Sequence, residues 1–227
     1  MGITIKSAAE IEIMRQAGRI NALALKAAMD AVRPGVTTAE LDRIAAKVIR
    51  SHGGAPAFLH YPNLVYPEVP YPATINASVN DELVHGIPGR RRLREGDIIS
   101  IDVGTVYRGF VGDSAVTVPV GAISAEAQRL LDVTREALRL AIGACRVGKR
   151  VGDISATIQE WVESQGYQVV REYTGHGVGR EMHEDPQITN WGKRDRGASL
   201  LPGMTFALEP MVTVGPPELY VKEDRWT

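Results

Sequence analysis

The chain has 227 residues and a formal net charge of −1, with 26 basic and 27 acidic side chains. An apolar content of 44% and a charged content of 23% are those of an ordinary globular protein that can bury a large core. The small net charge predicts no polyelectrolyte partner by itself, although a local basic patch is compatible with it. The single cysteine, Cys145, excludes an intramolecular disulfide and therefore a disulfide-stabilised secreted fold.

The sequence shows no recognisable targeting signal. The first residues contain no apolar segment followed by a cleavage site, and no later run reaches membrane-spanning length. We therefore expect a cytoplasmic protein that does not enter a membrane.

Helix-start signals predict four helices in chain order. Capping-box patterns begin at Ser7 and at Thr37, and apolar residues at helical spacing follow each of them. Ser124 is expected to cap a third long helix, and Asp153 is expected to begin a fourth. Residues 55–72, rich in proline and tyrosine, predict an ordered loop without regular structure.

The segment 98–113 predicts a β-hairpin that contains two aspartates. A turn between Tyr107 and Arg108 would place Asp102 and Asp113 directly opposite each other on one face. Two carboxylates so placed in apolar strands require a positive charge between them, and a divalent cation would supply it. The alternative is a solvent-facing hairpin with two surface aspartates.

Further strands are predicted on both sides of this hairpin. One strand region covers residues 74–84 and is followed by the segment His85-Gly-Ile-Pro-Gly. After the fourth helix, strands and loops are expected over residues 168–173, 175–179 and 203–214.

Two pairs of segments recur along the chain at similar offsets. Arg33–Leu41 parallels Arg146–Ile154 at an offset of 113 residues. Leu93–Asp102 parallels Leu200–Glu209 at an offset of 107 residues. The matches are short enough to arise by chance, and the alternative to chance is one structural unit used twice.

A repeated unit has a specific consequence for the fold. We expect a single α+β domain over 1–227, with pseudo-symmetric halves of about 1–120 and 121–227 and helices that cover a curved sheet. Asp102 and Glu209 then occupy equivalent strand positions in the two halves.

Two histidines and a glutamate add to the candidate ligands. His176 lies between glycines and His183 follows it, although a lone histidine is commonly structural or exposed. Glu209 lies in an apolar strand, where an unpaired charge would be costly. Asp102, Asp113, His176 and Glu209 together make a carboxylate-rich set that suits Mn, Fe or Co in a two-metal hydrolytic site.

The combination of motifs resembles a known enzyme family. The motifs are Asn80-Asp-Glu-Leu-Val-His85-Gly-Ile-Pro, Asp102 and Asp113 with ten residues between them, Gly-His176-Gly-Val-Gly, His183-Glu-Asp-Pro and Glu209-Pro. Together they resemble the type I methionine aminopeptidases of the short bacterial form, along almost the whole chain. The resemblance implies a pita-bread (creatinase/aminopeptidase-like) fold, in which helices cover a curved antiparallel sheet.

The resemblance also implies roles for the matching positions. The implied ligands of two divalent ions are Asp102, Asp113, His176 and Glu209. Asp113 would bridge the ions, the substrate amine would bind on the Asp102 side, and Glu209 would act as proton shuttle for the attacking water. His183 would stabilise the charge on the carbonyl oxygen, and His85 would contact the following peptide nitrogen.

A pocket for the methionine side chain is implied in the same way. Its lining would be Phe58, Tyr61, Tyr71, Met182 and Trp226. Core packing is the alternative for each of these residues. Residues 63–69 make the preceding loop longer than in the usual short form, which affects the placement of Tyr71.

The end of the sequence departs from the family pattern. Family members continue past the Trp226 position into a strand with a further glutamate that bridges both metals, whereas this sequence ends at Thr227. Glu218 and Glu223 do not match that glutamate. We therefore interpret the sequence as a C-terminally truncated form with a weakened second metal site and little activity.

These features predict a monomeric hydrolase that removes the initiator methionine from nascent proteins whose second residue is small. The alternatives are a non-catalytic binding protein and a proline-specific aminopeptidase of the same fold, which usually carries an additional N-terminal domain. A basic run is either a solvated loop or a contact with ribosomal RNA. Its residues are Arg90, Arg91, Arg92 and Arg94.

Overall fold

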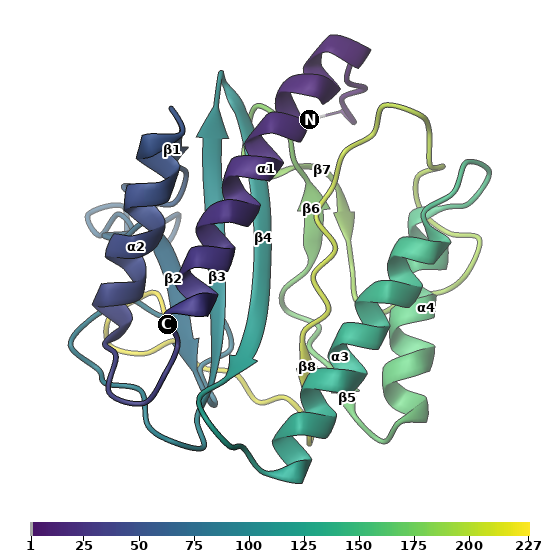
Figure 1. Ribbon diagram of the computed structural model, residues 1–227. Coiled ribbons are helices and arrows are strands. Elements are labelled where there is room, and N and C mark those ends of the chain that lie inside the picture. Colours follow the sequence, from purple (N-terminus) through teal and green to yellow (C-terminus); the bar gives the residue numbers. More distant parts are fainter. Residues whose placement is uncertain (1) are drawn as a thin grey trace. The chain divides into compact units, whose positions relative to one another are not determined.

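The computed structural model describes residues 2–227 (Figure 1). The helices are α1 (Ala8–Asp30), α2 (Thr38–Ser51), α3 (Ala125–Ala144) and α4 (Val151–Ser164). The strands are β1 (Ala55–Pro56), β2 (Ile75–Val79), β3 (Ile98–Tyr107), β4 (Phe110–Pro119), β5 (Gln168–Val169), β6 (Gly175–Gly177), β7 (Glu184–Ile188) and β8 (Val212–Thr213). Helices and antiparallel strands occur together, which confirms the predicted α+β class.

The chain divides into two compact units. The hairpin unit comprises Glu12–Ala127 together with Tyr220–Thr227. The histidine unit comprises Gln128–Leu219 together with the N-terminal residues as far as Ile11. Within residues 2–227, no helix combines the length and the apolar character that a membrane span requires.

The helix starts follow the capping signals of the sequence. The Glu10 N–H donates to Ser7 Oγ at 3.3 Å, and the Glu40 N–H donates to Thr37 Oγ1 at 3.2 Å. Both predicted capping boxes are thereby confirmed. The fourth helix begins at Val151, two residues before the predicted start, because the Asp153 carboxylate caps it from the first turn by accepting the N–H of Arg150 at 2.8 Å.

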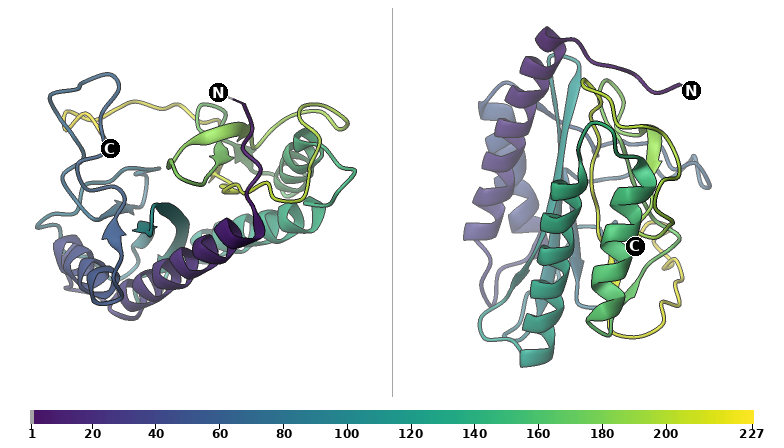
Figure 2. Two further views of the ribbon diagram at one scale, coloured as in Figure 1. Left: turned by 90° about the horizontal axis from the view of Figure 1, so that it is seen from above. Right: turned by 90° about the vertical axis from the view of Figure 1, so that its right-hand side faces the viewer.

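A single antiparallel sheet forms the centre of the hairpin unit. β4 pairs with β3 along its whole length, and β2 and β1 pair with different parts of β3. Helices α1 and α2 cover one face of this sheet (Figure 2). The core between them is built from Ala24, Ala28, Leu41, Ala45, Ile49, Ile75, Ala77, Val79, Ile99, Ile101 and Val103.

Helix α1 approaches the hairpin closely enough to require glycine at one position. A Cβ atom at Gly112 on β4 would lie 2.8 Å from the backbone of Ala17 and of Gly18. Beside this crossing, Asn21 Nδ2 donates to Ser114 Oγ at 2.7 Å, and Thr105 Oγ1 donates to Asn21 Oδ1 at 2.8 Å. The helix and both strands are therefore fixed to each other by packing and by buried hydrogen bonds.

The register of the hairpin differs from the predicted one. Asp102 pairs with Ala115, and Asp113 pairs with Gly104, so the two aspartates are diagonal neighbours on one face rather than directly opposite. The turn is centred between Arg108 and Gly109, whose φ values of 49° and 79° are those of a tight two-residue hairpin turn. The predicted face was correct, whereas the predicted turn centre was wrong by one residue.

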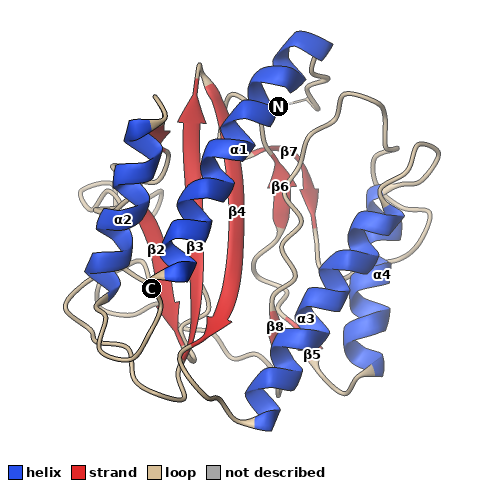
Figure 3. Cartoon of the chain, in the orientation of Figure 1, coloured by secondary structure: helices blue, strands red, loops and turns tan. Residues whose placement is uncertain are grey.

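The histidine unit has less regular structure. Its core joins α3 and α4 to the short two-stranded sheets β5–β8 and β6–β7. Trp161 Nε1 donates to the Val133 carbonyl at 3.0 Å and so connects the two helices. The segment 203–214, for which strand and loop were expected, is mostly loop, and Glu209 lies in the loop rather than in the predicted strand (Figure 3).

The sequence of that loop explains why a continuous ladder is missing. Pro202 and Pro210 have no N–H to donate, and Gly203 adopts a φ of 89°. Between the prolines, the segment still runs along β6, since the Ala207 N–H donates to the His176 carbonyl at 2.7 Å. The segment therefore brings Glu209 toward β6 without forming a long strand.

Candidate active site

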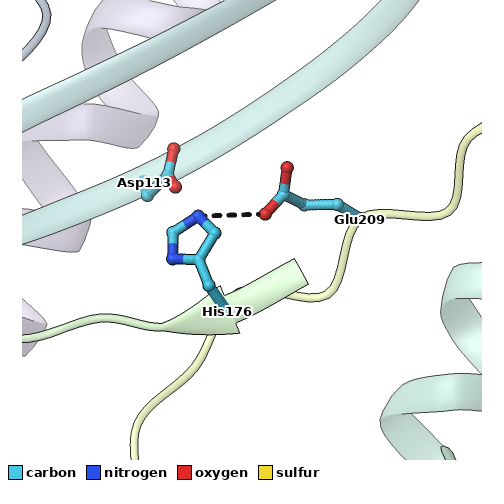
Figure 4. A group of neighbouring side chains, drawn as sticks. All are labelled: Asp113, His176 and Glu209. Atoms are coloured by element: carbon cyan, nitrogen blue, oxygen red, sulfur yellow. Dashed lines mark ion pairs between the residues drawn. The ribbon is translucent and has the colours of Figure 1, made fainter. Parts of the chain in front are cut away.

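The centre of the histidine unit is a histidine that faces a carboxylate. His176 on β6 is 8% exposed, and its Nε2 lies 3.1 Å from Glu209 Oε1 (Figure 4). His176 Nδ1 lies 2.9 Å from the Gly177 carbonyl oxygen, which can only accept a hydrogen bond, so the proton of the neutral ring is on Nδ1. The Nε2 lone pair is then directed toward the carboxylate.

This arrangement fits a divalent cation. Glu209 Oε1 is buried and accepts no hydrogen bond from the described residues. Two lone pairs at 3.1 Å repel each other unless a proton or a cation lies between them. An imidazole nitrogen and a carboxylate oxygen are ligands that first-row divalent metals prefer.

His183 lies beside His176 in the same unit. The ring centroids of the two histidines are 4.3 Å apart, and the adjacent Met182 is buried with 6% exposure. The turn that carries Met182 and His183 is held by Glu184. Its carboxylate accepts hydrogen bonds from the N–H groups of Arg180 and Glu181 at 2.8 and 3.2 Å.

A buried ion pair anchors this turn to the N-terminal segment. Lys6 Nζ donates to Glu184 Oε2 at 2.5 Å, and both side chains are almost inaccessible. Burial opposes ionisation of Glu184, but the hydrogen bonds from Lys6 and from the Glu181 N–H lower the pKa of this carboxyl below its usual value. Glu184 is therefore ionised at neutral pH, and its bond to Lys6 fixes the position of the turn that carries His183.

In the hairpin unit, Asp102 and Asp113 occupy the same face of the β3–β4 pair. Asn76, which is opposite Asp102 on β2, donates from Nδ2 to Asp102 Oδ2 at 2.7 Å. Asn76 is buried with 5% exposure, so its amide orients the aspartate within the sheet. Sequence reasoning did not identify Asn76, although an asparagine in the middle of an apolar strand was a visible signal.

Several of the predicted pocket residues assemble in the hairpin unit. Trp226 lies with its ring centroid 5.1 Å from Tyr71 and 6.0 Å from His85, in edge-to-face orientations. The ring centroid of Phe58 lies 6.5 Å from that of Tyr71, also in an edge-to-face orientation. Tyr61 is half-buried in the same loop region, where its N–H donates to the Phe58 carbonyl at 2.8 Å.

Tyr71 is the fixed member of this aromatic group. It is 2% exposed, and its hydroxyl is within 3.0 Å of the carbonyl oxygens of Ile75 and Gly86. Burial raises the pKa of the Tyr71 hydroxyl and the charge of Asp102 raises it further, so the hydroxyl remains a proton donor.

The basic run lies on the surface of the hairpin unit. Arg91 forms an ion pair with Glu82 at 3.0 Å, and Arg92 donates to the Gly35 carbonyl at 2.8 Å. Arg90 and Arg94 are exposed. Two of the four arginines therefore have a local structural role.

A second residue that sequence reasoning missed is Asn190. It is fully buried, and its Nδ2 donates to the Glu209 carbonyl at 2.8 Å. The bond fixes the backbone of the glutamate that faces His176. No local pattern marks this residue, because its partner is 19 residues further along the chain.

Known proteins resemble this chain along almost its whole length. The profile of Metallopeptidase family M24 matches residues 12–225. The methionine aminopeptidase of Clostridium acetobutylicum is 46% identical over 226 residues, which are 99% of this chain and 88% of that protein. The methionine aminopeptidase of Escherichia coli strain K12 is 40% identical over 229 residues, with coverage of 100% of this chain and 84% of that protein.

Solved structures of related enzymes superpose on this chain. The crystal structure of methionine aminopeptidase from Thermotoga maritima superposes with a TM-score of 0.94 and 44% identity, covering 99% of this chain and 88% of that chain. An Xaa-Pro dipeptidase from Bacillus anthracis superposes with a TM-score of 0.77 and 25% identity, but this chain covers only 54% of it. The predicted pita-bread fold is thereby confirmed.

The chain belongs to Metallopeptidase family M24, and within this family to the methionine aminopeptidases. It is accordingly a metalloaminopeptidase that uses divalent metal, as the sequence predicted.

Proposed function

We propose that this chain hydrolyses the peptide bond after the N-terminal methionine of nascent proteins whose second residue is small. The observation that carries this proposal is the His176–Glu209 pair, in which an imidazole lone pair and a buried carboxylate oxygen face each other at 3.1 Å. Family membership supports the same reaction.

We assign four metal ligands from the motifs that carry them. They are Asp102, Asp113, His176 and Glu209. These residues would hold two divalent ions of the Mn, Fe or Co type, with Asp113 shared by both, and the substrate amine would lie on the Asp102 side. When bound, the ions would polarise the scissile carbonyl and activate water, as is usual for two-metal hydrolases.

The other proposed roles belong to groups of the chain itself. Glu209 would take a proton from the attacking water and pass it to the leaving amine. His183 would donate a hydrogen bond to the carbonyl oxygen as negative charge develops there, and His85 would contact the next peptide nitrogen. The anchored turn before β7 supports this assignment, since it fixes His183 before substrate arrives.

The methionine side chain would enter an apolar pocket. Its proposed lining is Phe58, Tyr61, Tyr71, Met182 and Trp226. The edge-to-face aromatic contacts of the hairpin unit support this assignment, because flat apolar side chains around a thioether make favourable contacts with sulfur.

Partners and location follow from the reaction. We propose a monomeric, single-domain enzyme that acts in the cytoplasm on nascent chains and contacts the ribosome through Arg90 and Arg94, with Arg91 and Arg92 contributing positive charge. A ribosome pelleting assay with Arg90→Ala/Arg94→Ala should show weaker binding at moderate salt. Binding unchanged by these substitutions would contradict the contact.

The reaction is tested with peptides and with metal analysis. Purified protein loaded with Mn or Co should release methionine from Met-Gly peptides and should leave Xaa-Pro peptides intact. Titration with Mn is expected to show one tightly bound and one weakly bound ion per chain, and saturation at one equivalent would contradict the two-ion assignment. Preferential cleavage of Xaa-Pro peptides would overturn the proposed function.

A further inference from the structure

The last residues of the chain are fastened to the loop that follows β1. In Figure 2 the C-terminal residues (yellow) run beside this loop, which covers residues 63–69. Asn63 Nδ2 donates to the Arg225 carbonyl at 3.0 Å, and Trp226 Nε1 donates to the Val69 carbonyl at 2.9 Å. Both bonds join segments more than 150 residues apart in sequence.

The Arg225 side chain adds two further contacts to the same loop. Its guanidinium lies 4.7 Å above the ring of Tyr66 and forms an ion pair with Glu68. The planar guanidinium can stack on the ring and bind the carboxylate at the same time, which an ammonium group cannot do. We call Asn63, Tyr66, Glu68 and Arg225 the C-terminal brace.

Asn63 is the most buried member of the brace. It is 8% exposed, and its Oδ1 accepts the N–H groups of Val65 and Tyr66, both at 2.9 Å. One amide therefore shapes the loop with its oxygen and holds the C-terminal segment with its nitrogen. Removal of this side chain would leave the N–H groups of Val65 and Tyr66 and the carbonyl of Arg225 without their side-chain partner.

The segment needs such support because its backbone is strained. Arg225 has a φ of 65°, in the left-handed region that non-glycine residues seldom adopt. Contacts on the carbonyl and the side chain of Arg225 hold this conformation. The conformation in turn sets the direction in which Trp226 leaves the backbone.

The position of Trp226 matters because of the groups that its ring touches. It packs against Tyr71, which is immobilised by burial and by its hydroxyl contacts, and against His85. Tyr71 is held by the sheet, whereas Trp226 is held by its bond to Val69 and through the segment that the brace contacts. Among the aromatic residues of this group, Trp226 is thus the one whose position depends on the brace.

We infer that the C-terminal brace is a specificity device: Asn63, Glu68 and Arg225 are positioning residues that hold Trp226 so that the pocket accepts the unbranched side chain of methionine and rejects branched ones. This inference rests on the proposed function. A pocket distinguishes side chains that differ by one methylene by about 10- to 200-fold when its walls are fixed, and less when a wall moves.

The kinetic test compares Asn63→Ala and Arg225→Ala with the parent on Met-Gly, norleucyl-Gly and Leu-Gly peptides. We expect KM for the methionyl peptide to rise about tenfold in Asn63→Ala, while kcat falls less, because wall position affects binding more than chemistry. Selectivity for methionine over leucine should fall by a similar factor. Arg225→Lys should recover less than half of the loss, since lysine cannot stack and pair together.

The matched control is Arg194→Ala. Arg194 also forms an exposed ion pair, with Glu160, but in the histidine unit and outside the brace. The substitution Arg194→Ala should leave both KM and the selectivity for methionine over leucine unchanged. Thermal unfolding of every variant identifies any that fail to fold. If Asn63→Ala or Arg225→Ala fails, Glu68→Gln replaces it, because this substitution alters only the exposed ion pair of the brace.

The spectroscopic test does not depend on activity. With Trp161→Phe and Trp191→Phe, Trp226 is the only tryptophan, and acrylamide quenching reports its accessibility. Quenching should increase in Asn63→Ala and Arg225→Ala. Unchanged quenching and unchanged selectivity in folded variants would overturn the positioning role of the brace. A parent protein that cleaves no methionyl peptide would instead overturn the proposed function and, with it, the assigned methionine pocket.

Discussion

The two units contain the same hydrogen-bonded junction between a helix start and an incoming segment. In each unit, a helix with a capping carboxylate in its first turn begins beside a chain segment that arrives from further along the sequence. The numbers of equivalent residues in the two units differ by 113 at the helix start and by 107 in the incoming segment. The matching bonds are Thr38 N to Arg91 O (3.1 Å) and Leu93 N to Val36 O (2.8 Å) in the hairpin unit, and Val151 N to Ala198 O (3.0 Å) and Leu200 N to Lys149 O (2.8 Å) in the histidine unit.

Beyond the junction, the two units differ. In the hairpin unit the segment continues as a ten-residue strand, and Asp102 on it is oriented by Asn76. In the histidine unit the segment is interrupted by prolines, and Glu209 faces His176 with a carboxylate oxygen that accepts no hydrogen bond from the described residues. The same junction therefore supports one carboxylate that a neighbouring side chain orients and one whose buried oxygen accepts no hydrogen bond from the described residues.

Loss of the Glu209 carboxylate should have the largest effect. Glu209→Gln keeps the shape but removes the charge and the basic oxygen, and we expect kcat to fall by about 10²- to 10⁴-fold. Glu218→Gln, at an exposed glutamate nearby in sequence, is the control and should retain parent activity. Comparable rates for the two variants in methionine release would contradict the role assigned to Glu209.

The orienting asparagines test whether the two carboxylates differ in their support. Asn76→Ala leaves Asp102 without its side-chain donor, and Asn190→Ala releases the backbone of Glu209. Each should weaken metal affinity by about 10- to 100-fold, as is usual for groups that orient ligands. Calorimetric titration with Mn measures this, and an affinity unchanged in Asn76→Ala would show that the strand alone holds Asp102.

Helix capping is the third difference between the units. Thr37 caps α2 with its own hydroxyl, whereas Arg150 at the equivalent position contributes no side-chain cap to α4. Thr37→Ala should lower the free energy of unfolding by about 1 kcal/mol. Arg150→Ala should change it by no more than about 0.5 kcal/mol. Urea denaturation of both variants measures the difference, and equal losses would contradict it.

The distance along the chain explains which features were predictable. Capping boxes lie within four residues, so the starts of α1 and α2 could be predicted from sequence alone. The aspartates of the hairpin were assigned to the correct face because side-chain direction alternates along a strand, but the turn centre depends on the positive φ values of Arg108 and Gly109.

Long-range contacts left no comparable signal. Asn76 and Asp102 are 26 residues apart, and Asn63 and Arg225 are 162 residues apart. Hydrogen bonds of this kind depend on how distant segments pack, and many sequences satisfy the same packing. The orienting residues and the C-terminal brace were therefore found only in the structure, although the extended loop that carries the brace was visible in the sequence.

The smallest expected effect concerns acid stability. Hydrogen bonds from the Thr37 N–H and hydroxyl lower the pKa of Glu40, and hydrogen bonds from the Arg150 and Asp195 N–H groups lower the pKa of Asp153. A carboxyl with a lower pKa in the folded state contributes stability above its unfolded pKa of about 4 and loses it as pH falls through the folded value.

Glu40→Gln and Asp153→Asn should therefore reduce the loss of unfolding free energy between neutral pH and pH 3. Both amides can still accept the capping bonds but no longer titrate, so stability at low pH should change less than stability at neutral pH. Ser124→Ala is the control, because Ser124 caps α3 through a hydroxyl at 3.1 Å and its loss should lower stability equally at every pH. If only Glu40→Gln reduces the loss of unfolding free energy at low pH, the two capping carboxylates are not equivalent. The two junctions would then share their backbone hydrogen bonds but not the contribution of the carboxylate.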